Sequence, residues 1–407
     1  MKKIVLMGLM GVVASAFAAP TVTNVQMAQT GSRHIEVSYT LGGEDAIVTV
    51  DFLTNGVSIG EQVFTTLDGD VNCKVVQGDR KLRWKARKDW PDRQARLTAK
   101  VRAWTLMNPP DYMTIDLVGE SKGTVRYYVS TNALPGGLSS DVYRKDKMVL
   151  RKIPARGVVW TMGTAAGDLN RQSNEKAHQV VLTQDYFFSI YLVTQQQYMN
   201  IMGSNPSHFQ RAQYGSDDYL MGPVESVSFN TYRDGNWPTG DKLPAGGTMI
   251  ATLRDWTGLD GLDLPTETQW EYACRAGSMT WRPWGNTIDA TLLNYGSNVT
   301  NEIYEENFKY RTTRVDAYPP NAWGLYDVLG NVEEMCLDWY VATPDDFKSV
   351  TPVFDPVGPA SAGGKVTRGG GCLHNGSKNR SAWRRDSGTD VGQGRGVVGV
   401  RVCCPVK

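Results

Sequence analysis

Apolar and polar positions alternate in short runs over the first quarter of the chain. In the run 35–41, apolar side chains occupy every odd position and polar side chains every even position. The runs 48–52, 82–86 and 97–103 repeat this period of two. Such a period is typical of strands that bury one face and expose the other, and the glycine-containing turns between the runs favour several short strands. The pattern predicts an all-β sandwich over residues 19–108.

This sandwich contains a single cysteine, Cys73. A disulfide between its two sheets, as found in antibody domains, therefore cannot form within it. The strand pattern alone leads us to expect a sandwich of the fibronectin type III or immunoglobulin kind. Residues 109–150 follow, with Pro- and Gly-rich turns, and they are predicted to form a linker that carries one extra strand at 123–129.

From residue 151 the pattern changes to short helices among turns. Thr194 and Thr266 are each followed three residues later by a glutamine, which is the spacing of a capping box at the start of a helix. Gly203 is placed to end the first of these helices. Turn residues are frequent around both helices and long strands are few. Residues 151–407 are therefore predicted to form an α+β domain rather than a βαβ array.

Charge is almost balanced over the whole chain, with 43 Lys and Arg against 42 Asp and Glu. This balance does not favour a nucleic-acid partner. Residues 74–102 are the exception, with eleven Lys or Arg and three Asp. In the stretch 81–87 the basic residues fall on one face of a strand. We interpret this face as a solvated edge strand that charge protects from pairing, in preference to a patch for an anionic polymer.

The first residues have the composition of an export signal. Two lysines precede an apolar run that ends in the small-residue triplet Ala16-Phe17-Ala18, which is typical of a secretory signal peptide cleaved after Ala18. That run and every later apolar segment are shorter than the roughly 20 residues that a membrane-spanning helix needs. We therefore expect residues 1–18 to be removed and the protein to be exported to the periplasm, the exterior or the cell surface, with no membrane span.

Neither the cysteines nor the histidines form a familiar zinc motif. The six cysteines include no Cys-x-x-Cys pair, and the four histidines lie far apart in the sequence. These spacings exclude a zinc finger and a His-Glu-x-x-His metalloprotease. An exported chain can oxidise its cysteines, but their spacing does not reveal which of them would pair.

Five blocks in the second domain carry a resemblance. They are VWTMG at 159–163, LPTETQWEYACRAG at 264–277, GLYDVLGNV at 324–332, RGG at 368–370 and GVR at 399–401. In this order they resemble the sulfatase-modifying factor family, whose best-known members are formylglycine-generating enzymes. The resemblance implies a decorated fold of the C-type lectin kind over residues 151–407. Because family members include oxidoreductases, iron enzymes and non-catalytic ligand-display proteins, the fold alone does not choose a function.

In formylglycine-generating enzymes a cysteine pair follows the Arg-Gly-Gly block and binds copper(I), which prefers soft thiolate ligands. The corresponding stretch here, 369–380, contains Cys372 and no second cysteine before Cys403. We infer that the two-thiolate site is lost and that copper is not a cofactor. Cys372 and His374 stay as weak catalytic candidates for a divergent metal site.

The iron-dependent members of the family draw three histidines largely from a helical domain. The first domain of this chain is β-rich and contains only His34. We therefore expect a non-catalytic ligand-binding or scaffold module, whose partner is a protein, a peptide or a glycan. The alternative is a divergent formylglycine-generating-type oxidoreductase, or a non-haem metal enzyme of the same family, so the sequence leaves the catalytic status open.

The block at 324–332 and its continuation contain the acids of a candidate metal site. By position, the resemblance implies a calcium ion held by the side chains of Asp327 and Glu334 and by the carbonyls of Gly330 and Val332. Such a set of hard oxygens suits calcium. The spacing of Asn331 and Glu334 also fits the start of a capped helix, and the two interpretations are compatible.

Two further features are implied by the resemblance. A second calcium site would fall near Asn294 and Asn307, where amides stand without an obvious carboxylate. A disulfide would join Cys274 to Cys403 or Cys404, because family members tie the equivalent helix to the last strand.

A ligand groove is the last feature that the resemblance implies, since ligand-display relatives bind through the region that corresponds to 371–379. The alternative is that the arginines around this stretch pair with buried acids. Two of the candidate residues, Lys378 and Asn379, are expected to be exposed. The candidate groove residues are Arg368, Lys378, Asn379, Arg380 and Arg384.

Overall fold

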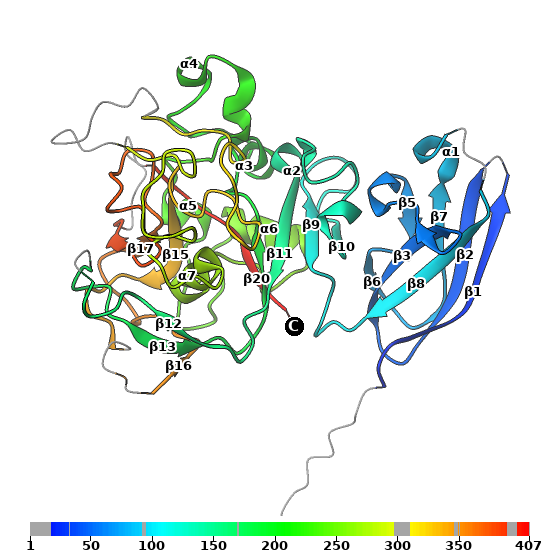
Figure 1. Cartoon of the computed structure of the whole chain (residues 1–407), viewed down its shortest axis with the longest axis horizontal. Coiled ribbons are helices and arrows are strands. Elements are labelled where there is room, and N and C mark those ends of the chain that lie inside the picture. Colours follow the sequence, from blue (N-terminus) through cyan, green and yellow to red (C-terminus); the bar gives the residue numbers. More distant parts are fainter. Residues whose placement is uncertain are drawn as a thin grey trace, which may run out of the picture. The chain divides into compact units, whose positions relative to one another are not determined.

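The computed structural model describes residues 18–31, 33–91, 95–168, 171–296, 310–345, 349, 351–388 and 397–406. Apart from Ala18, the predicted signal peptide lies outside these residues. The chain divides into two compact units, Met1–Pro109 and Pro110–Lys407 (Figure 1). No helix within the described ranges is both long enough and apolar enough to cross a membrane.

The first unit consists of two antiparallel sheets around one core. Trp84 and Phe52, which come from different sheets, stack in this core with ring centroids 4.8 Å apart. The unit is mostly β-sheet, with a short α-helix, α1 (Ala86–Asp89), and its kinship to fibronectin type III or immunoglobulin domains stays a prediction. The first sheet has the order β1 (Thr21–Thr30), β2 (His34–Gly42), β7 (Gly78–Lys85) and β5 (Leu67–Gly69). The second sheet contains β4 (Val57–Ser58), β3 (Ala46–Thr54), β6 (Cys73–Val75) and β8 (Leu97–Trp104).

The basic strand face lies on β7, where buried Leu82 and Trp84 alternate with exposed lysine and arginine side chains. Strand β7 pairs with β2 on one side and with β5 on the other. The interpretation of this face as an edge strand is therefore wrong. Part of the charge is balanced across the sheet, since Glu36 of β2 accepts hydrogen bonds from Lys81 at 2.9 Å and Arg83 at 3.3 Å.

The second unit is built on a five-stranded antiparallel sheet (Figure 1). The predicted linker 109–150 belongs to this unit, because it supplies two strands of that sheet and the start of a third. The predicted strand at 123–129 is confirmed as one of them. In spatial order the strands are β10 (Val125–Tyr128), β9 (Tyr112–Asp116), β11 (Lys147–Ile153), β14 (Tyr186–Ser189) and β20 (Cys403–Pro405).

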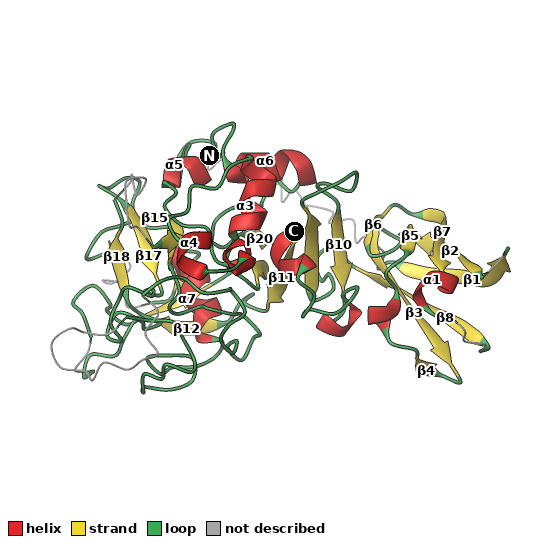
Figure 2. Cartoon of the chain, turned by 90° about the horizontal axis from the view of Figure 1, so that it is seen from above, coloured by secondary structure: helices red, strands yellow, loops and turns green. Residues whose placement is uncertain are grey.

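Two smaller sheets complete the second unit (Figure 2). One has the order β12 (Val159–Met162), β13 (His178–Val181) and β16 (Val353–Phe354). The other has the order β18 (Arg384–Asp386), β17 (Lys365–Arg368), β15 (Glu333–Trp339) and β19 (Val398–Gly399). In this sheet, β17 ends at the start of the Arg-Gly-Gly block and β18 begins at Arg384, beyond the loop that follows the block. The sheet therefore positions the candidate site.

Short helices pack around these sheets and give the unit its α+β character. Both predicted capping boxes are confirmed, at Thr194 before α3 and at Thr266 before α7. Gly203 ends α3 in the left-handed conformation, as predicted. The α-helices of this unit are α2 (Val142–Lys145), α3 (Gln195–Met202), α4 (Arg211–Tyr214), α5 (Phe229–Tyr232), α6 (Met249–Thr257) and α7 (Glu267–Arg275).

The expectation of a disulfide from Cys274 to the last strand is wrong, because Cys274 forms no disulfide among the described residues. The sulfur of Cys274 lies 3.6 Å from Ser381 Oγ. The sulfur of Cys403 instead lies 3.6 Å from Gln269 Oε1. The two thiols therefore contact different neighbours, Ser381 and Gln269.

Candidate functional site

The loop after the Arg-Gly-Gly block places Cys372 in the core. Its side chain is completely buried, and its backbone N–H donates to the carbonyl of Asn331 at 3.0 Å. Burial raises the pKa of the Cys372 thiol far above its usual range. A metal-binding or nucleophilic cysteine needs the opposite environment, one that favours the thiolate. Cys372 therefore has the surroundings of a packing residue.

His374, the second catalytic candidate, takes part in a charged cluster with Glu333. Its Nδ1 lies 3.1 Å from Glu333 Oε1, and its side chain is 18% exposed. The carboxylate of Glu333 also accepts from Arg385 Nε at 2.8 Å. Burial lowers the pKa of His374. Sequence reasoning did not predict that the Glu333 carboxylate would lie beside a histidine.

The arginines of the predicted groove point inward. Arg380 donates to both oxygens of Glu175, at 2.9 and 2.7 Å, and Arg384 donates to both oxygens of Glu267, at 2.6 and 2.7 Å. Arg368 is fully buried and donates to Glu271. The structure therefore agrees with the alternative, in which these arginines pair with buried acids.

The two remaining groove candidates, Lys378 and Asn379, differ in their exposure to solvent. Lys378 is exposed, as expected, but Asn379 is completely buried. The Asn379 amide nitrogen donates to the carbonyls of His374 and Asn375, at 3.0 and 2.9 Å. The expectation that Asn379 is exposed was wrong because this side chain holds the loop closed from within.

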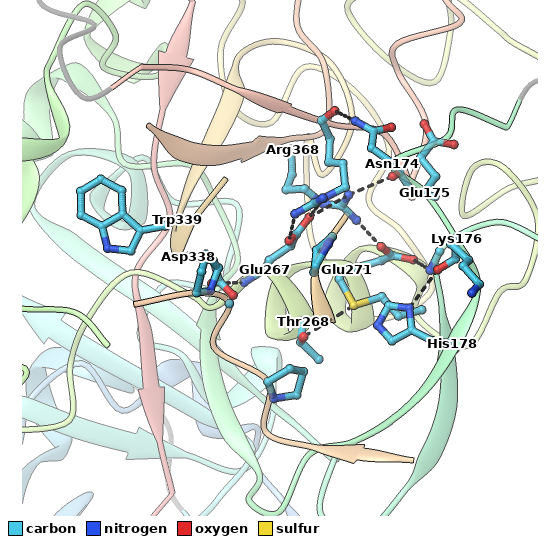
Figure 3. Close-up of a pocket in the computed structure, with 18 residues that line it drawn as sticks. Asn174, Glu175, Lys176, His178, Glu267, Thr268, Glu271, Asp338, Trp339 and Arg368 are labelled. Atoms are coloured by element: carbon cyan, nitrogen blue, oxygen red, sulfur yellow. Dashed lines mark hydrogen bonds and ion pairs between the residues drawn. The ribbon is translucent and has the colours of Figure 1, made fainter. Parts of the chain in front are cut away.

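Two acids of α7, Glu267 and Glu271, lie with Arg368 and Arg384 around a small cavity (Figure 3). Its volume of about 30 Å³ has room for about one water molecule. Beside it, Asp338 Oδ2 accepts from the backbone N–H of Glu267 at 2.7 Å, and burial raises the pKa of Asp338 to about 7. The cavity is too small for a ligand, so this cluster is an ionic core beneath the loop.

Sequence reasoning did not identify Glu175, Glu267 or Glu271 as partners. A signal was present for two of them, since Glu267 and Glu271 stand four residues apart in the predicted helix. That spacing puts two like charges on one helix face, which is unfavourable unless cations lie opposite. Glu175 gave no such signal, because it reaches Arg380 across a separation of 205 residues.

Comparison with known protein families shows to which family the chain belongs. Residues 148–405 match the family model described as "Sulfatase-modifying factor enzyme 1-like domain", which is more than half of the chain. The chain belongs to this family. The match ends in β20, so it takes in both sides of the ionic core.

Relatives in the sulfatase-modifying factor family carry different names. The chain is 27% identical to the formylglycine-generating enzyme of Mus musculus over 285 residues, which are 62% of this chain and 73% of that protein. It is 39% identical over 111 residues to serine/threonine-protein kinase pkn1 of Chlamydia pneumoniae, covering 27% of this chain and 16% of that protein. Among solved structures, Treponema denticola variable protein 1 aligns over 63% of this chain and 95% of its own, at 24% identity and a TM-score of 0.48.

The calcium site expected for this family member is only partly matched by its residues. Asp327 fits a hard cation, because its Oδ1 is buried without a hydrogen-bond partner and burial raises the pKa of this carboxyl to about 7. Glu334 does not fit, since both of its oxygens lie 2.9 Å from Arg401 Nε. Gly330 and Val332 lie in the turn between these two acids.

The helix-cap interpretation of this turn is wrong. Asn331 has a φ of 60° and is followed by strand β15, which begins at Glu333. Its amide instead accepts from the N–H of Thr313 at 3.0 Å and donates to Asp327 Oδ2 at 3.0 Å. The turn is held by these contacts rather than by a helix.

The second expected calcium site is described only in part. Asn294 is buried and its amide donates to the carbonyl of Arg311 at 2.9 Å. Asn307 lies outside the described residues. Across the part of the chain that the structure covers, no three His, Cys, Asp or Glu side chains gather as a metal-binding group.

Proposed function

We propose that this protein is a non-catalytic member of its family, in which the second unit binds a protein, peptide or glycan or serves as a scaffold. One observation carries the proposal. The single thiol of the stretch 369–380, Cys372, is buried in surroundings that disfavour its thiolate. Copper(I) chemistry needs two accessible soft thiolates, so this environment argues against it.

The arrangement of the loop also supports a binding role. Leu373 and Lys378 are exposed on it, while Arg380 and Asn379 anchor it from below. A loop held on a rigid frame is a common way to present a recognition surface. The ionic core beneath the loop supplies such a frame.

A divergent oxidoreductase is the second candidate function, and the pair of His374 and Glu333 favours it. The Glu333 carboxylate lies 3.1 Å from Nδ1 of His374, although this nitrogen makes no hydrogen bond among the described residues. The other ring nitrogen could bind a metal or a proton. This candidate needs no thiolate at Cys372. It predicts activity that depends on His374.

A copper titration with a peptide-oxidation assay separates the two candidates. The purified protein is titrated with copper(I), then incubated with a cysteine-containing peptide and oxygen while mass spectrometry follows the peptide. We expect no stoichiometric copper binding and no conversion of the peptide cysteine to an aldehyde. Turnover that is lost in Cys372→Ser or His374→Gln would overturn the non-catalytic proposal.

Export is part of the proposed function, and it rests on the sequence of residues 1–18. Expression of the full chain in a bacterial host with a secretion system tests it. We expect the exported protein to begin at Ala19, as determined by intact mass and N-terminal sequencing. A chain that keeps Met1 and stays in the cytoplasm would contradict export.

We also propose that a calcium ion binds at the turn 327–332. Asp327 supports this, because its buried, unpartnered oxygen would be satisfied by a hard cation. The carbonyls of Gly330 and Val332 would supply further ligands, while Glu334 stays with Arg401. A calcium ion there would stabilise the turn and would take no part in chemistry.

A further inference from the structure

A second, much larger cavity lies on another side of α7. Its volume is about 310 Å³, which is at the lower end of the range of roughly 300–1,000 Å³ that is typical of small-molecule sites. It is bounded by the segment 237–243, the segment 260–266, the end of α6, and strands β15 and β20. All of the residues that line it are described.

Part of the cavity lining is apolar. Leu264, Leu337 and Pro405 contribute aliphatic surface, and Trp237 contributes an aromatic ring. Contact with such a surface favours a ligand that has an apolar body, since each square ångström of apolar area removed from water contributes to binding. The polar lining residues decide which end group that body can carry.

Two cations of the lining have donors that are not used. Arg254 donates through Nε to the carbonyl of Leu262 at 2.6 Å and through Nη2 to Asp263 at 2.9 Å, while Nη1 donates to no described group. The ammonium of Lys242 lies 5.6 Å from the centre of the Trp237 ring and makes no ion pair within the described ranges. Both cations can therefore receive an acceptor from a ligand.

Three acids line the cavity, Asp241, Asp260 and Asp263, and each of them already interacts with other groups. Asp263 accepts from Arg233 Nε at 3.0 Å as well as from Arg254, so its carboxylate is paired with two guanidinium groups. Asp241 accepts through Oδ1 from the N–H of Leu243 at 3.1 Å. The unused donors identified in the described lining are thus Arg254 Nη1, the Lys242 ammonium and Trp237 Nε1, which is buried without a partner.

We propose that this cavity binds a small organic carboxylate with an apolar body. The body would lie against Trp237 and Leu264, and the carboxylate would accept from Arg254 Nη1 and Lys242. The same chemistry is offered by a free aryl- or alkyl-carboxylic acid and by the C-terminal residue of a peptide. The inference does not depend on the proposed function, because a catalytic member of the family could have the same cavity.

Isothermal titration calorimetry of the purified full chain with 3-phenylpropionate tests the proposal, with 3-phenylpropionamide as the matched uncharged ligand. We expect one site with a dissociation constant below about 1 mM, which is reasonable for a ligand of this size. The amide should bind about tenfold more weakly, because it loses a charge-assisted hydrogen bond. An N-acetylated tripeptide ending in phenylalanine, with and without C-terminal amidation, distinguishes the peptide source from the free acid.

Variants locate the binding. Gly261 lines the cavity, and a Cβ at this position would lie 3.3 Å from the Pro405 ring. Gly261→Leu should therefore block the cavity and abolish binding, while Gly246→Leu, at a position where a Cβ meets nothing within 4 Å, is the matched control. Lys242→Met should weaken the acid about threefold, as for an exposed ion pair, and leave the amide unchanged. Circular dichroism confirms that each variant is folded.

Three results would overturn the proposal. The first is the absence of heat from the acid, the amide and the peptides at millimolar concentration. The second is binding that survives Gly261→Leu, which would place the ligand elsewhere. The third is equal affinity for the acid and the amide, which would remove the role of the carboxylate.

Discussion

The pair of Glu175 and Arg380 illustrates how single residues stabilise the second unit. Both side chains are at least 98% buried, and the guanidinium donates to both carboxylate oxygens. In Glu175→Gln the guanidinium stays buried without its counter-charge. We expect the free energy of unfolding to fall by ~3–5 kcal/mol, which is typical of breaking a buried pair. Urea denaturation followed by far-UV circular dichroism measures this loss.

The exposed pair of Arg211 and Asp217 provides the control in the same unit. Its side chains are 72% and 65% exposed, so Asp217→Asn should change the free energy of unfolding by less than about 1 kcal/mol. The double variant Glu175→Leu with Arg380→Met should lose less than Glu175→Gln alone, because no charge is left unpaired. Equal losses for Glu175→Gln and Asp217→Asn would contradict the importance of burial.

Asp338 makes the stability of the second unit depend on pH. Burial, with the nearby charge of Glu267, raises the pKa of Asp338 to about 7 in the folded state, against an ordinary value near 4 in the unfolded chain. The folded state therefore holds a proton that the unfolded chain releases. The contribution of Asp338 is fully present below pH 4 and is lost as the pH rises towards 7.

Asp338→Asn mimics the protonated form and tests this dependence. The variant amide oxygen can still accept from the N–H of Glu267. We expect the wild type to lose ~3 kcal/mol of stability relative to the variant between pH 4 and pH 7. Urea midpoints at both pH values give this difference. A difference of zero would show that folding leaves the pKa of Asp338 unchanged, and one of opposite sign would show that folding lowers it.

Residue-level features could be predicted only where they are local in sequence. The sequence identified the arginines of the groove, but not Glu267 as the partner of Arg384, which lies 117 residues away. The predicted exposure of Asn379 was wrong for a different reason: its partners are only four and five residues away, but the closed conformation of this loop leaves no pattern in the sequence. Such pairings depend on the three-dimensional arrangement, which no local pattern encodes.

At the scale of the elements, the capping box of α7 is the clearest local determinant. Thr266 Oγ1 accepts from the N–H of Gln269 at 3.2 Å, and Gln269 Oε1 accepts from the N–H of Thr266 at 3.0 Å. Thr266→Ala removes the first bond and should lower the free energy of unfolding by ~1 kcal/mol. Thr266→Ser keeps the oxygen and should be close to wild type in the same urea experiment. A loss from Ser as large as that from Ala would contradict capping as the cause.

The contrast between Thr266 and Asn331 explains which elements the sequence could predict. Both are followed three residues later by a residue that suits a capping box. Before α7 the helix forms, but after Asn331 the chain enters β15, which pairs with β17 and β19. Sheet partners distant in sequence therefore override a local helix signal. The same reason explains why residues 109–150 looked like a linker, although their strands join the sheet of the second unit.

For the molecule as a whole, the two units are predicted to fold independently. The apolar core of the first unit contains residues from Ile35 to Ala86, and the clusters of the second unit begin at Met113. A fragment of residues 110–407 should therefore unfold at the same temperature as the corresponding transition of the full chain. Differential scanning calorimetry of both proteins checks this. A fragment without a cooperative transition would contradict independent folding.

The proposed calcium ion should stabilise the folded chain in proportion to its concentration. At a free calcium concentration 100 times the dissociation constant, one site adds about 2.7 kcal/mol to the free energy of unfolding. We therefore expect the melting transition of the second unit to move upwards when calcium is added and to return when a chelator is added in excess. Magnesium at the same concentration should have a smaller effect, because it demands a tighter octahedral geometry.

Asp327→Asn decides whether the turn 327–332 is the source of this shift. The variant loses the charge that would attract the cation, so its melting temperature should be the same with calcium and with chelator. Glu334→Gln provides the contrast: it should be destabilised in both conditions by the loss of the pair with Arg401, yet it should keep its response to calcium. If Asp327→Asn keeps the full response, the ion binds elsewhere. If the wild type shows no response and elemental analysis finds no calcium, the orphaned oxygen of Asp327 is accommodated by protonation, as its raised pKa allows.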